Sequence, residues 1–235
     1  MRFDSIKAVT FDAAHTLYHP YPSVGAIYRE VMQRHGLAYP ADQLQEGFKR
    51  AFRCVSKDRS ILDGERREWS YWKSIVGESI SHFSPPPEDF DALFEDIWEE
   101  FSHGDRWRAE PTAAATLDAL RKRGYQTALL TNWDSRVRQV VEETGFSDKF
   151  DALFISSEIG FEKPDPKIFQ HCQRELNLAP HEILHVGDSL QHDIEGARNS
   201  GWHALRICGE EEKTSSASNV PTIKDISETL RFLRV

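Results

Sequence analysis

The sequence is poor in the residues and segments that typify secreted, zinc-binding or membrane-spanning proteins. Its 235 residues include only three cysteines, Cys54, Cys172 and Cys208, which are widely spaced and form no Cys-x-x-Cys pair. Neither a disulfide framework nor a zinc site is therefore indicated. No stretch approaches about 18 apolar residues, and the N-terminal run MRFDSIKAVTFD lacks the apolar core of a signal peptide. We expect reduced cysteines and a cytoplasmic location.

Positive charge is also scarce. Lysine and arginine total 29 against 38 aspartates and glutamates, which gives a net charge of -9. Nucleic acids and anionic membranes bind clustered cationic side chains, so we expect neither as a partner. Hydrophobic residues at 39% and charged residues at 29% are typical of a soluble globular chain, and the length allows a core domain with a smaller inserted one. The sequence leaves the oligomeric state open, with a monomer favoured.

Strand-like runs and helix-length segments alternate along most of the chain. The runs lie at 6–11, 125–131, 151–156, 182–187 and 203–207, and the helical segments at 112–123, 134–144, 165–177 and 190–200. Such alternation indicates a parallel sheet with helices on both faces. The sequence therefore predicts an α/β fold whose core is a doubly wound, Rossmann-like parallel sheet.

One region breaks this alternation. Residues 18–107 contain several amphipathic helical patterns, including VGAIYREVMQRHG and DFDALFEDIWEEF, and no convincing strand. We therefore expect an α-helical cap domain at 18–107, inserted into a core domain formed by 1–17 and 108–235. The polar, glycine-bounded segment 209–219 is expected to be a mobile surface loop.

Polar residues follow the predicted strands at their carboxyl ends, where ligands bind in an open α/β sheet. These residues are Asp12, Thr131, Asn132, Lys163, Asp188 and Asp193. Any one of them alone is more often a helix cap or a turn former. Together, carboxylates from separate strands offer a hard-oxygen site for Mg²⁺, and a hydroxyl and an ammonium beside them can hold phosphoryl oxygens.

The order of these residues resembles the four motifs of the haloacid dehalogenase superfamily. Asp12 with Thr16 is similar to the first motif, and Thr131 to the second. Lys163, followed by proline, is similar to the third motif, and GDSLQHD at 187–193 to the fourth. The resemblance spans nearly the whole chain.

Two further features resemble parts of this superfamily. The helical insert directly after the first motif is similar to the subfamily I caps, which close over the active site and select the substrate. The Asn-aromatic-Asp run at 132–134 is similar to that in the subfamily of haloacid dehalogenase-like hydrolase domain-containing protein 3 and rhythmically expressed gene 2 protein. Neither feature identifies the substrate.

The resemblance implies a magnesium-dependent hydrolase of a small phosphorylated substrate. Asp12 would attack phosphorus to form an aspartyl-phosphate, which water then hydrolyses. Thr131 and Lys163 would neutralise the phosphoryl charge, and these two residues and Asn132 would contact the substrate. By the same resemblance, Mg²⁺ would be held by Asp12, the backbone carbonyl of Ala14, Asp188 and, as a ligand or an orienting group, Asp193.

The first motif departs from that of the family's phosphatases at one position. Most of them carry a second aspartate two residues after the nucleophile, which protonates the leaving group and then activates water, but here that residue is Ala14. General acid–base help is worth about 10²–10⁴ in rate, so we expect slow turnover of substrates with poor leaving groups. His15 titrates near neutrality and is a candidate substitute, although adjacent residues usually point in different directions.

Two other chemistries of the superfamily and one non-catalytic role compete with this interpretation. Phosphonoacetaldehyde hydrolases share D-x-A-x-T at the first motif but need a cap lysine for a Schiff base, for which Lys49, Lys57 and Lys73 are available. Haloacid dehalogenases resemble FDAAHTL too, but they work without a metal and lack the paired acids that Asp188 and Asp193 provide. A chain that kept only the fold would be a binding or scaffold protein, which the intact nucleophile, lysine and paired acids argue against.

Overall fold

The computed structural model of the chain describes residues 3–209 and 220–234. The loop predicted at 209–219 lies outside the described residues except for Gly209. The chain divides into two compact units. The first, which we call the sheet unit, comprises Met1–His19, Ala109–Trp133 and Gly145–Val235, and the second, the helical unit, comprises Pro20–Arg108 and Asp134–Thr144.

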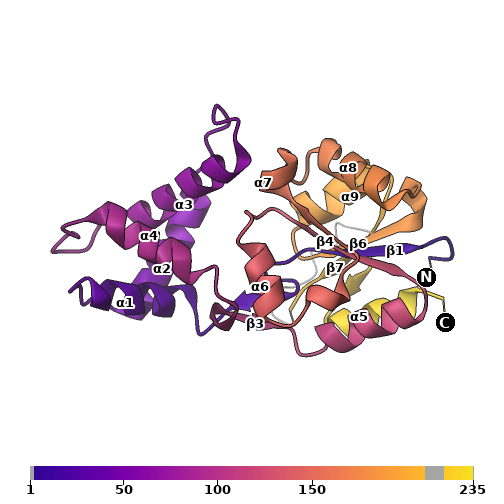
Figure 1. Cartoon of the computed structure of the whole chain (residues 1–235), viewed down its shortest axis with the longest axis horizontal. Helices are drawn as coiled ribbons and strands as arrows, with labels where there is room; N and C mark the ends of the chain where they lie inside the picture. The colour runs from indigo at the N-terminus through magenta and orange to yellow at the C-terminus, as the bar shows by residue number, and fades with distance from the viewer. Residues whose placement is uncertain (1–2, 210–219, 235) are drawn as a thin grey trace. The chain divides into compact units, whose positions relative to one another are not determined.

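A six-stranded sheet forms the centre of the sheet unit (Figure 1). Its strands are β1 (Ala8–Phe11), β4 (Gln126–Thr131), β5 (Ala152–Ile155), β6 (Ile183–Gly187), β7 (His203–Ile207) and β8 (Thr222–Ile223). They lie in the order β5-β4-β1-β6-β7-β8, and every neighbouring pair is parallel. This is the order of a Rossmann-type sheet, in which the direction of strand succession reverses between β1 and β6. The predicted fold class of the core is confirmed.

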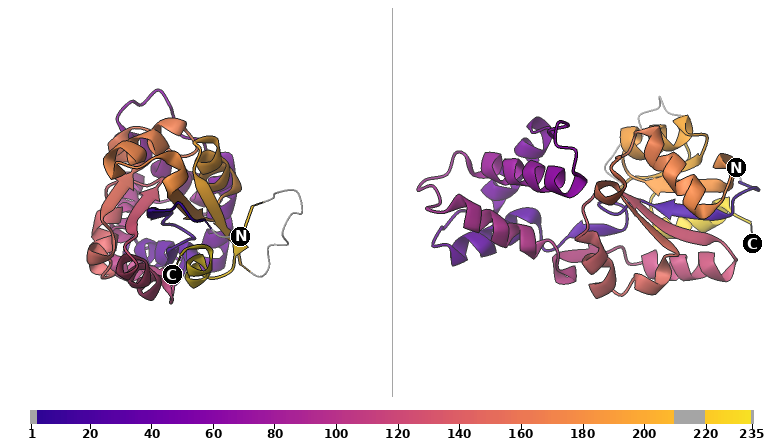
Figure 2. Two further views of the ribbon diagram at one scale, coloured as in Figure 1. Left: turned by 90° about the vertical axis from the view of Figure 1, so that its right-hand side faces the viewer. Right: turned by 45° about the horizontal axis from the view of Figure 1, so that its top comes forward.

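Helices cover both faces of this sheet, as Figure 1 and the two views of Figure 2 show. α5 (Ala113–Lys122) and the 3-10 segment η5 (Ile226–Phe232) lie on one face, and α8 (Pro166–Leu176) and α9 (Gly196–Asn199) lie on the other. The remaining elements of the unit are η2 (Ser147–Lys149), α7 (Ser156–Ile159), η3 (Pro180–Glu182) and the π-helical turn η4 (Leu190–Glu195). Because both faces are covered, every residue of β1 is buried.

The start of α8 is set by its local sequence, and this fixes where the chain leaves the loop that carries Lys163. Asp165 caps the helix by accepting from the Lys167 N–H, and Pro166 occupies the first helical position, where a missing N–H costs nothing. Ile168 and Phe169 then pack into the apolar core beneath the sheet. Each such fully buried side chain stabilises the fold by about 1.5–3 kcal/mol.

The helical unit contains α1 (Val24–Arg34), α2 (Ala41–Cys54), α3 (Gly64–Ile80), α4 (Phe90–Glu100), η1 (Gly104–Arg106) and α6 (Val137–Glu143). Ser23, Asp63 and Asp89 cap α1, α3 and α4, and each accepts from the backbone N–H three residues on. The unit has an apolar core of its own. None of the described helices is both long enough and apolar enough to cross a membrane.

Short strands occur where the sequence predicted none. β2 (Tyr18–Pro20) and β3 (Trp107–Ala109) pair as a two-stranded sheet at the two ends of segment 18–107, so the expectation of no strand was wrong there. Strands of two or three residues are too short to show a period-2 pattern, which also explains why β8 is missing from the five predicted strands. Residues 134–144, which the sequence prediction put in the core domain, group with the helical unit.

Candidate active site

The carboxyl ends of β1 and β6 bring Asp12 and Asp188 together. β1 and β6 are neighbours, with Phe11 opposite Val186, and the Asp12 N–H continues their ladder by donating to the Val186 carbonyl at 2.9 Å. Asp188 directly follows Gly187, the last residue of β6. Both aspartates therefore lie where the order of the strands reverses, which is the usual ligand-binding position in such a sheet.

Lys163 is buried beside Asp12, with 2% of its surface exposed. Its ammonium donates to Oδ1 of Asp12 at 2.7 Å, to Oδ1 of Asp193 at 2.6 Å and to the Leu130 carbonyl at 2.8 Å. Burial lowers the pKa of Lys163, but attraction to the two carboxylates outweighs burial and raises this pKa to about 12. Lys163 is therefore a permanently charged ammonium in a fixed position.

Asn132 follows β4 and binds the backbone of Lys163. Its Oδ1 accepts from the Lys163 N–H at 2.7 Å, and its Nδ2 donates to the Lys163 carbonyl at 2.8 Å. These two bonds hold the Lys163 loop against the end of β4. Asn132 thus positions Lys163, and the substrate contact indicated by the sequence stays a prediction.

Asp193 lies in η4, and its carboxylate accepts three hydrogen bonds. Oδ1 accepts from Lys163 and, at 3.1 Å, from Nε2 of His185, while Oδ2 accepts from the Ser189 N–H at 2.9 Å. A Cβ on Gly187 would lie 2.3 Å from Cγ of Asp193, so only glycine leaves room for this carboxylate. A π-helical turn of this kind often marks a functional site.

The three aspartates form a cluster that could hold a metal ion. One carboxylate oxygen each from Asp12, Asp188 and Asp193 lies within 4.8 Å of the other two. Burial raises the pKa of Asp12 and of Asp188, and repulsion from Asp193 adds to both shifts. Burial also opposes ionisation of Asp193, but Lys163 and His185 outweigh it and hold the Asp193 pKa low. Three carboxylates around one ammonium leave excess negative charge, and an all-oxygen set with that charge suits Mg²⁺.

The turn that follows Asp12 is strained. His15 has a φ of 63°, in the left-handed region that costs a non-glycine residue about 1–3 kcal/mol. Its side chain is exposed, and its ring centroid lies 5.8 Å from that of His19. Strain of this kind is often stored at functional sites, and here the strained turn also carries the Ala14 carbonyl.

Two threonine hydroxyls near the motif residues have no hydrogen-bond partner within the described part of the chain. Oγ1 of Thr16 is buried without a partner. Thr131 ends β4, is 1% exposed and makes no side-chain hydrogen bond to other described residues. An unpaired buried hydroxyl such as that of Thr16 costs about 1–3 kcal/mol, so a ligand oxygen that accepted from it would gain affinity.

Thr10 and His185 belong to this site and were missed from the sequence. Thr10 and His185 lie opposite each other on β1 and β6, in strands that are otherwise almost wholly apolar. A polar residue in the middle of each of two neighbouring buried strands was the signal that could have found them, because buried polar groups need partners.

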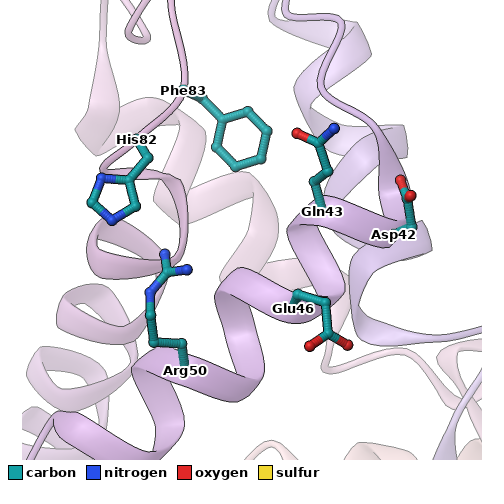
Figure 3. Close-up of a pocket in the computed structure, with 6 residues that line it drawn as sticks. All are labelled: Asp42, Gln43, Glu46, Arg50, His82 and Phe83. Atoms are coloured by element: carbon teal, nitrogen blue, oxygen red, sulfur yellow. The ribbon is translucent and has the colours of Figure 1, made fainter.

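The helical unit has a pocket of about 340 Å³ (Figure 3). It is lined by Asp42, Gln43, Glu46 and Arg50 of α2 and by His82 and Phe83 after α3. This lining contains two carboxylates and a single guanidinium, and therefore does not favour a phosphate dianion. None of the motif residues lines this pocket.

The candidate Schiff-base lysines of the helical unit are each paired with a carboxylate. Lys49 and Lys73 lie 2.8 Å from their acidic partners, and Lys57 pairs with a buried glutamate. The partners, in order along the chain, are Glu46, Glu68 and Asp91. A Schiff base needs a neutral amine, whereas an ion pair favours the ammonium. The structure offers no support for phosphonoacetaldehyde-type chemistry at these lysines.

Comparisons with known proteins agree with the motif pattern. A family model described as haloacid dehalogenase-like hydrolase matches residues 6–201. Haloacid dehalogenase-like hydrolase domain-containing protein 3 from Homo sapiens is 30% identical over 211 residues, which cover 87% of this chain and 82% of the relative. Ribulose-1,5-bisphosphate 5-phosphatase from Halopiger xanaduensis is 28% identical over 233 residues, which cover 96% of this chain and 95% of that protein.

Solved structures resemble the whole chain as well. L-2-haloacid dehalogenase from Xanthobacter autotrophicus has a TM-score of 0.72 to this structure at 20% sequence identity, covering 96% of this chain and 97% of the dehalogenase. At this identity the likeness shows the fold alone.

Proposed function

The chain belongs to the haloacid dehalogenase-like hydrolase family, and from this premise we propose that it hydrolyses a small phosphorylated substrate with Mg²⁺, through an aspartyl-phosphate on Asp12. The observation that carries the proposal is the cluster of Asp12, Asp188 and Asp193, in which the two buried members, Asp12 and Asp193, accept from the Lys163 ammonium. The relative named ribulose-1,5-bisphosphate 5-phosphatase supports a phosphomonoester as the class of substrate.

We propose that the ligands of Mg²⁺ are Asp12, the Ala14 carbonyl and Asp188. Of the two roles left open for Asp193, the three donors already bound to its carboxylate support orientation of the site. When bound, Mg²⁺ neutralises charge on the phosphoryl oxygens and so makes attack by a carboxylate feasible. The excess negative charge of the aspartate cluster supports this choice of cofactor.

In the proposed reaction, an oxygen of Asp12 attacks phosphorus while the bond from phosphorus to the leaving oxygen breaks. Water then attacks phosphorus, which releases inorganic phosphate and restores the Asp12 carboxylate. The Lys163 ammonium stabilises the negative charge of the phosphoryl group in both steps. The unpaired Thr131 hydroxyl donates to a phosphoryl oxygen, and Asn132 keeps Lys163 in place.

Proton transfer is the step of the proposed reaction that this site assists least. With Ala14 two residues after the nucleophile, no carboxylate at that position can give a proton to the leaving oxygen or take one from water. The leaving oxygen must then depart as an anion or take its proton from water or from His15. We therefore propose that acyl and aryl phosphates, which have good leaving groups, react faster than alkyl phosphates.

We also propose that the helical segment 18–107 is a substrate-selecting cap on a core formed by 1–17 and 108–235. The resemblance to subfamily I caps and the separate apolar core of the helical unit support this role. All three cysteines are free, which fits the reducing cytoplasm that we propose as the location.

A screen of phosphorylated metabolites, with and without Mg²⁺, tests this function. We expect release of inorganic phosphate that requires Mg²⁺ and is lost in Asp12→Asn, because an amide is too poor a nucleophile. Phosphonoacetaldehyde and a 2-haloacid belong in the same screen. Cleavage of either without phosphomonoester hydrolysis would contradict the proposal, and turnover of nothing at all would favour a binding or scaffold role.

A further inference from the structure

A line of buried polar contacts runs from the middle of the sheet to the active site. Thr10 of β1 and His185 of β6 lie opposite each other, and both are fully buried. The Thr10 hydroxyl oxygen is 2.8 Å from Nδ1 of His185, and Nε2 of His185 is 3.1 Å from Oδ1 of Asp193. The ammonium of Lys163 reaches that same oxygen at 2.6 Å. The line therefore ends at the cation beside Asp12.

The Thr10 hydroxyl has two acceptors within reach, Nδ1 of His185 at 2.8 Å and the Leu184 carbonyl at 3.5 Å, and the arrangement of protons that uses the shorter contact satisfies every member of this line. The Asp193 carboxylate can only accept, so Nε2 of His185 carries a proton and donates it. The buried ring lies close to the Lys163 ammonium, and such a place disfavours a second positive charge, so Nδ1 carries no proton. Nδ1 then accepts from the Thr10 hydroxyl. His185 is thus a neutral imidazole in the Nε2–H form.

This arrangement of hydrogen bonds fixes the orientation of the Asp193 carboxylate and the position of the Lys163 ammonium. Oδ1 of Asp193 is held between His185 and Lys163, and its Oδ2 is held by the Ser189 N–H. The carboxylate cannot rotate without breaking a buried hydrogen bond and leaving its donor unpaired. Because Lys163 has Asp193 as one of its three acceptors, fixing Asp193 also fixes the ammonium that faces Asp12.

We propose that His185, with Thr10 behind it, is a positioning residue for the Lys163 ammonium and acts through Asp193. It touches neither the nucleophile nor the substrate. Its effect is to hold the ammonium where negative charge develops on the transferring phosphoryl group. The inference rests on the proposed phosphoryl-transfer function and identifies two residues outside the four motifs on which the rate would depend.

A purely structural role for these two residues leads to the opposite expectation. His185 packs edge-on against the ring of Phe169, with centroids 6.3 Å apart, so an apolar side chain would find apolar neighbours there. Buried polar groups are costly even when paired, and well-packed apolar replacements are often neutral or stabilising. If His185 and Thr10 served stability alone, apolar variants that still fold should keep full activity.

Two pairs of variants separate these roles. His185→Met removes the ring and its donor, whereas His185→Gln keeps an N–H near the place of Nε2. Thr10→Val removes only the hydroxyl at nearly constant volume, and Thr10→Ser retains it. Thr116→Val is the matched control, because Thr116 is a buried threonine of α5 whose hydroxyl donates to the Thr112 carbonyl.

The readouts are kcat and KM for p-nitrophenyl phosphate, Mg²⁺ affinity by calorimetry, and thermal unfolding of the whole chain. His185→Met should lower kcat by about 10–100-fold, the usual effect of losing an outer partner of a catalytic site. KM and Mg²⁺ affinity should stay near those of the wild type, since the ammonium acts most on the transition state. Thr10→Val should lower kcat less, the Gln and Ser variants should recover activity, and Thr116→Val should not change it.

A folded His185→Met or Thr10→Val protein with wild-type kcat would overturn the proposal. Nitrogen NMR of the imidazole gives a second readout that needs no turnover. It should show a protonated Nε2 in the wild type, and an Nε2 without a proton would equally overturn the proposal. If the wild type has no phosphatase activity but the expected imidazole form, the proposed function fails while the hydrogen-bonded line itself stands.

Discussion

Ala14 stands two residues after Asp12, the nucleophile that we propose, where a carboxylate could pass a proton to the leaving group. Replacing it with aspartate should supply the missing acid and base at the right spacing. We expect Ala14→Asp to raise kcat/KM for an alkyl phosphate by some part of the roughly 10²–10⁴ that such catalysis provides. An aryl phosphate, which needs little help to leave, should gain much less.

The comparison requires one alkyl and one aryl phosphate with both proteins. Equal wild-type rates on the two substrates would mean that another group already supplies the proton. The same conclusion would follow if Ala14→Asp folds, binds Mg²⁺ and gains nothing. His15, exposed in the strained turn next to Ala14, is then the residue to replace.

Asp188 is the aspartate of the cluster that is not hydrogen-bonded to the Lys163 ammonium and is only half-buried, so it is the one most available to a cation. Burial and repulsion from Asp193 raise the pKa of Asp188, and a bound cation would relieve both. We expect Asp188→Ala to weaken Mg²⁺ binding, measured by calorimetry, by at least about tenfold. Asp148→Ala is the control, since it removes an exposed carboxylate of η2. Equal Mg²⁺ affinity in the two variants would place the metal elsewhere.

At the scale of elements, Gly187 at the end of β6 leaves the space that the Asp193 carboxylate occupies. A methyl group on Gly187 would overlap the Asp193 carboxylate, so η4 or the strand end would have to move. Gly187→Ala should lower the free energy of unfolding by about 1–3 kcal/mol, as overpacking does. It should also reduce kcat more than this loss of stability explains, because displaced Asp193 no longer holds Lys163.

Gly77→Ala in α3 is a matched control for that prediction. There the added methyl would meet only the ring edge of Phe90, at 3.3 Å, and alanine favours the helix by about 1 kcal/mol over glycine. Urea unfolding measures the free energy of unfolding of both variants, and steady-state kinetics measure their kcat. If Gly187→Ala changes the free energy of unfolding and kcat no more than Gly77→Ala does, the close approach of Asp193 to β6 affects neither stability nor catalysis.

Which elements the sequence predicts depends on their length. The strands at β1, β4, β5, β6 and β7 are long enough to show β-rich runs. α5 and α8 have apolar faces, and α8 also has a capping aspartate. The strands β2, β3 and β8 have too few residues for any period. Segment 190–200 was expected to be one helix, but it is a π-helical turn followed by α9, because Asp193 reaches back past Gly187. That contact is tertiary and leaves no local pattern.

At the scale of the whole molecule, one contribution to the pH dependence of stability comes from an ion-pair network in the helical unit. Glu100 accepts from Arg34 and from Arg106, each at 2.6 Å. Burial raises the pKa of the Glu100 carboxyl, but these hydrogen bonds outweigh it, and the net shift is downward. A lowered folded-state pKa means that the contribution to stability is present above the ordinary pKa of 4.5 and is lost as the pH falls.

Glu100→Gln should therefore cost about 1–2 kcal/mol in the free energy of unfolding at neutral pH. The difference from the wild type should shrink as the pH is lowered past 4.5. Urea denaturation at several pH values measures this, with the exposed Glu46→Gln as the control. A difference that is constant with pH would show that the Glu100 charge contributes nothing.

The clustering of Asp12, Asp188 and Asp193 was predictable from the sequence, whereas the contacts that hold these residues in place were not. Topology places the ends of β1, β4 and β6 together, so the order of polar residues after these strands was sufficient to predict the aspartate cluster. The comparisons confirm the predicted family and the predicted similarity to haloacid dehalogenase-like hydrolase domain-containing protein 3. The bonds from Asn132 to the Lys163 backbone, and those of Thr10 and His185, depend on side-chain directions that no spacing along the chain encodes.

The most direct test of the central claim is to trap the phosphorylated enzyme. The protein is mixed with Mg²⁺ and p-nitrophenyl phosphate, quenched with acid, and the peptide containing Asp12 is analysed by mass spectrometry. Since no carboxylate at position 14 activates water, the second step should be slow and the intermediate should accumulate. We predict one phosphoryl group on Asp12 in the wild type and none in Asp12→Asn or without Mg²⁺. Turnover by the wild type with no phosphoryl group on Asp12 at any time would contradict the account.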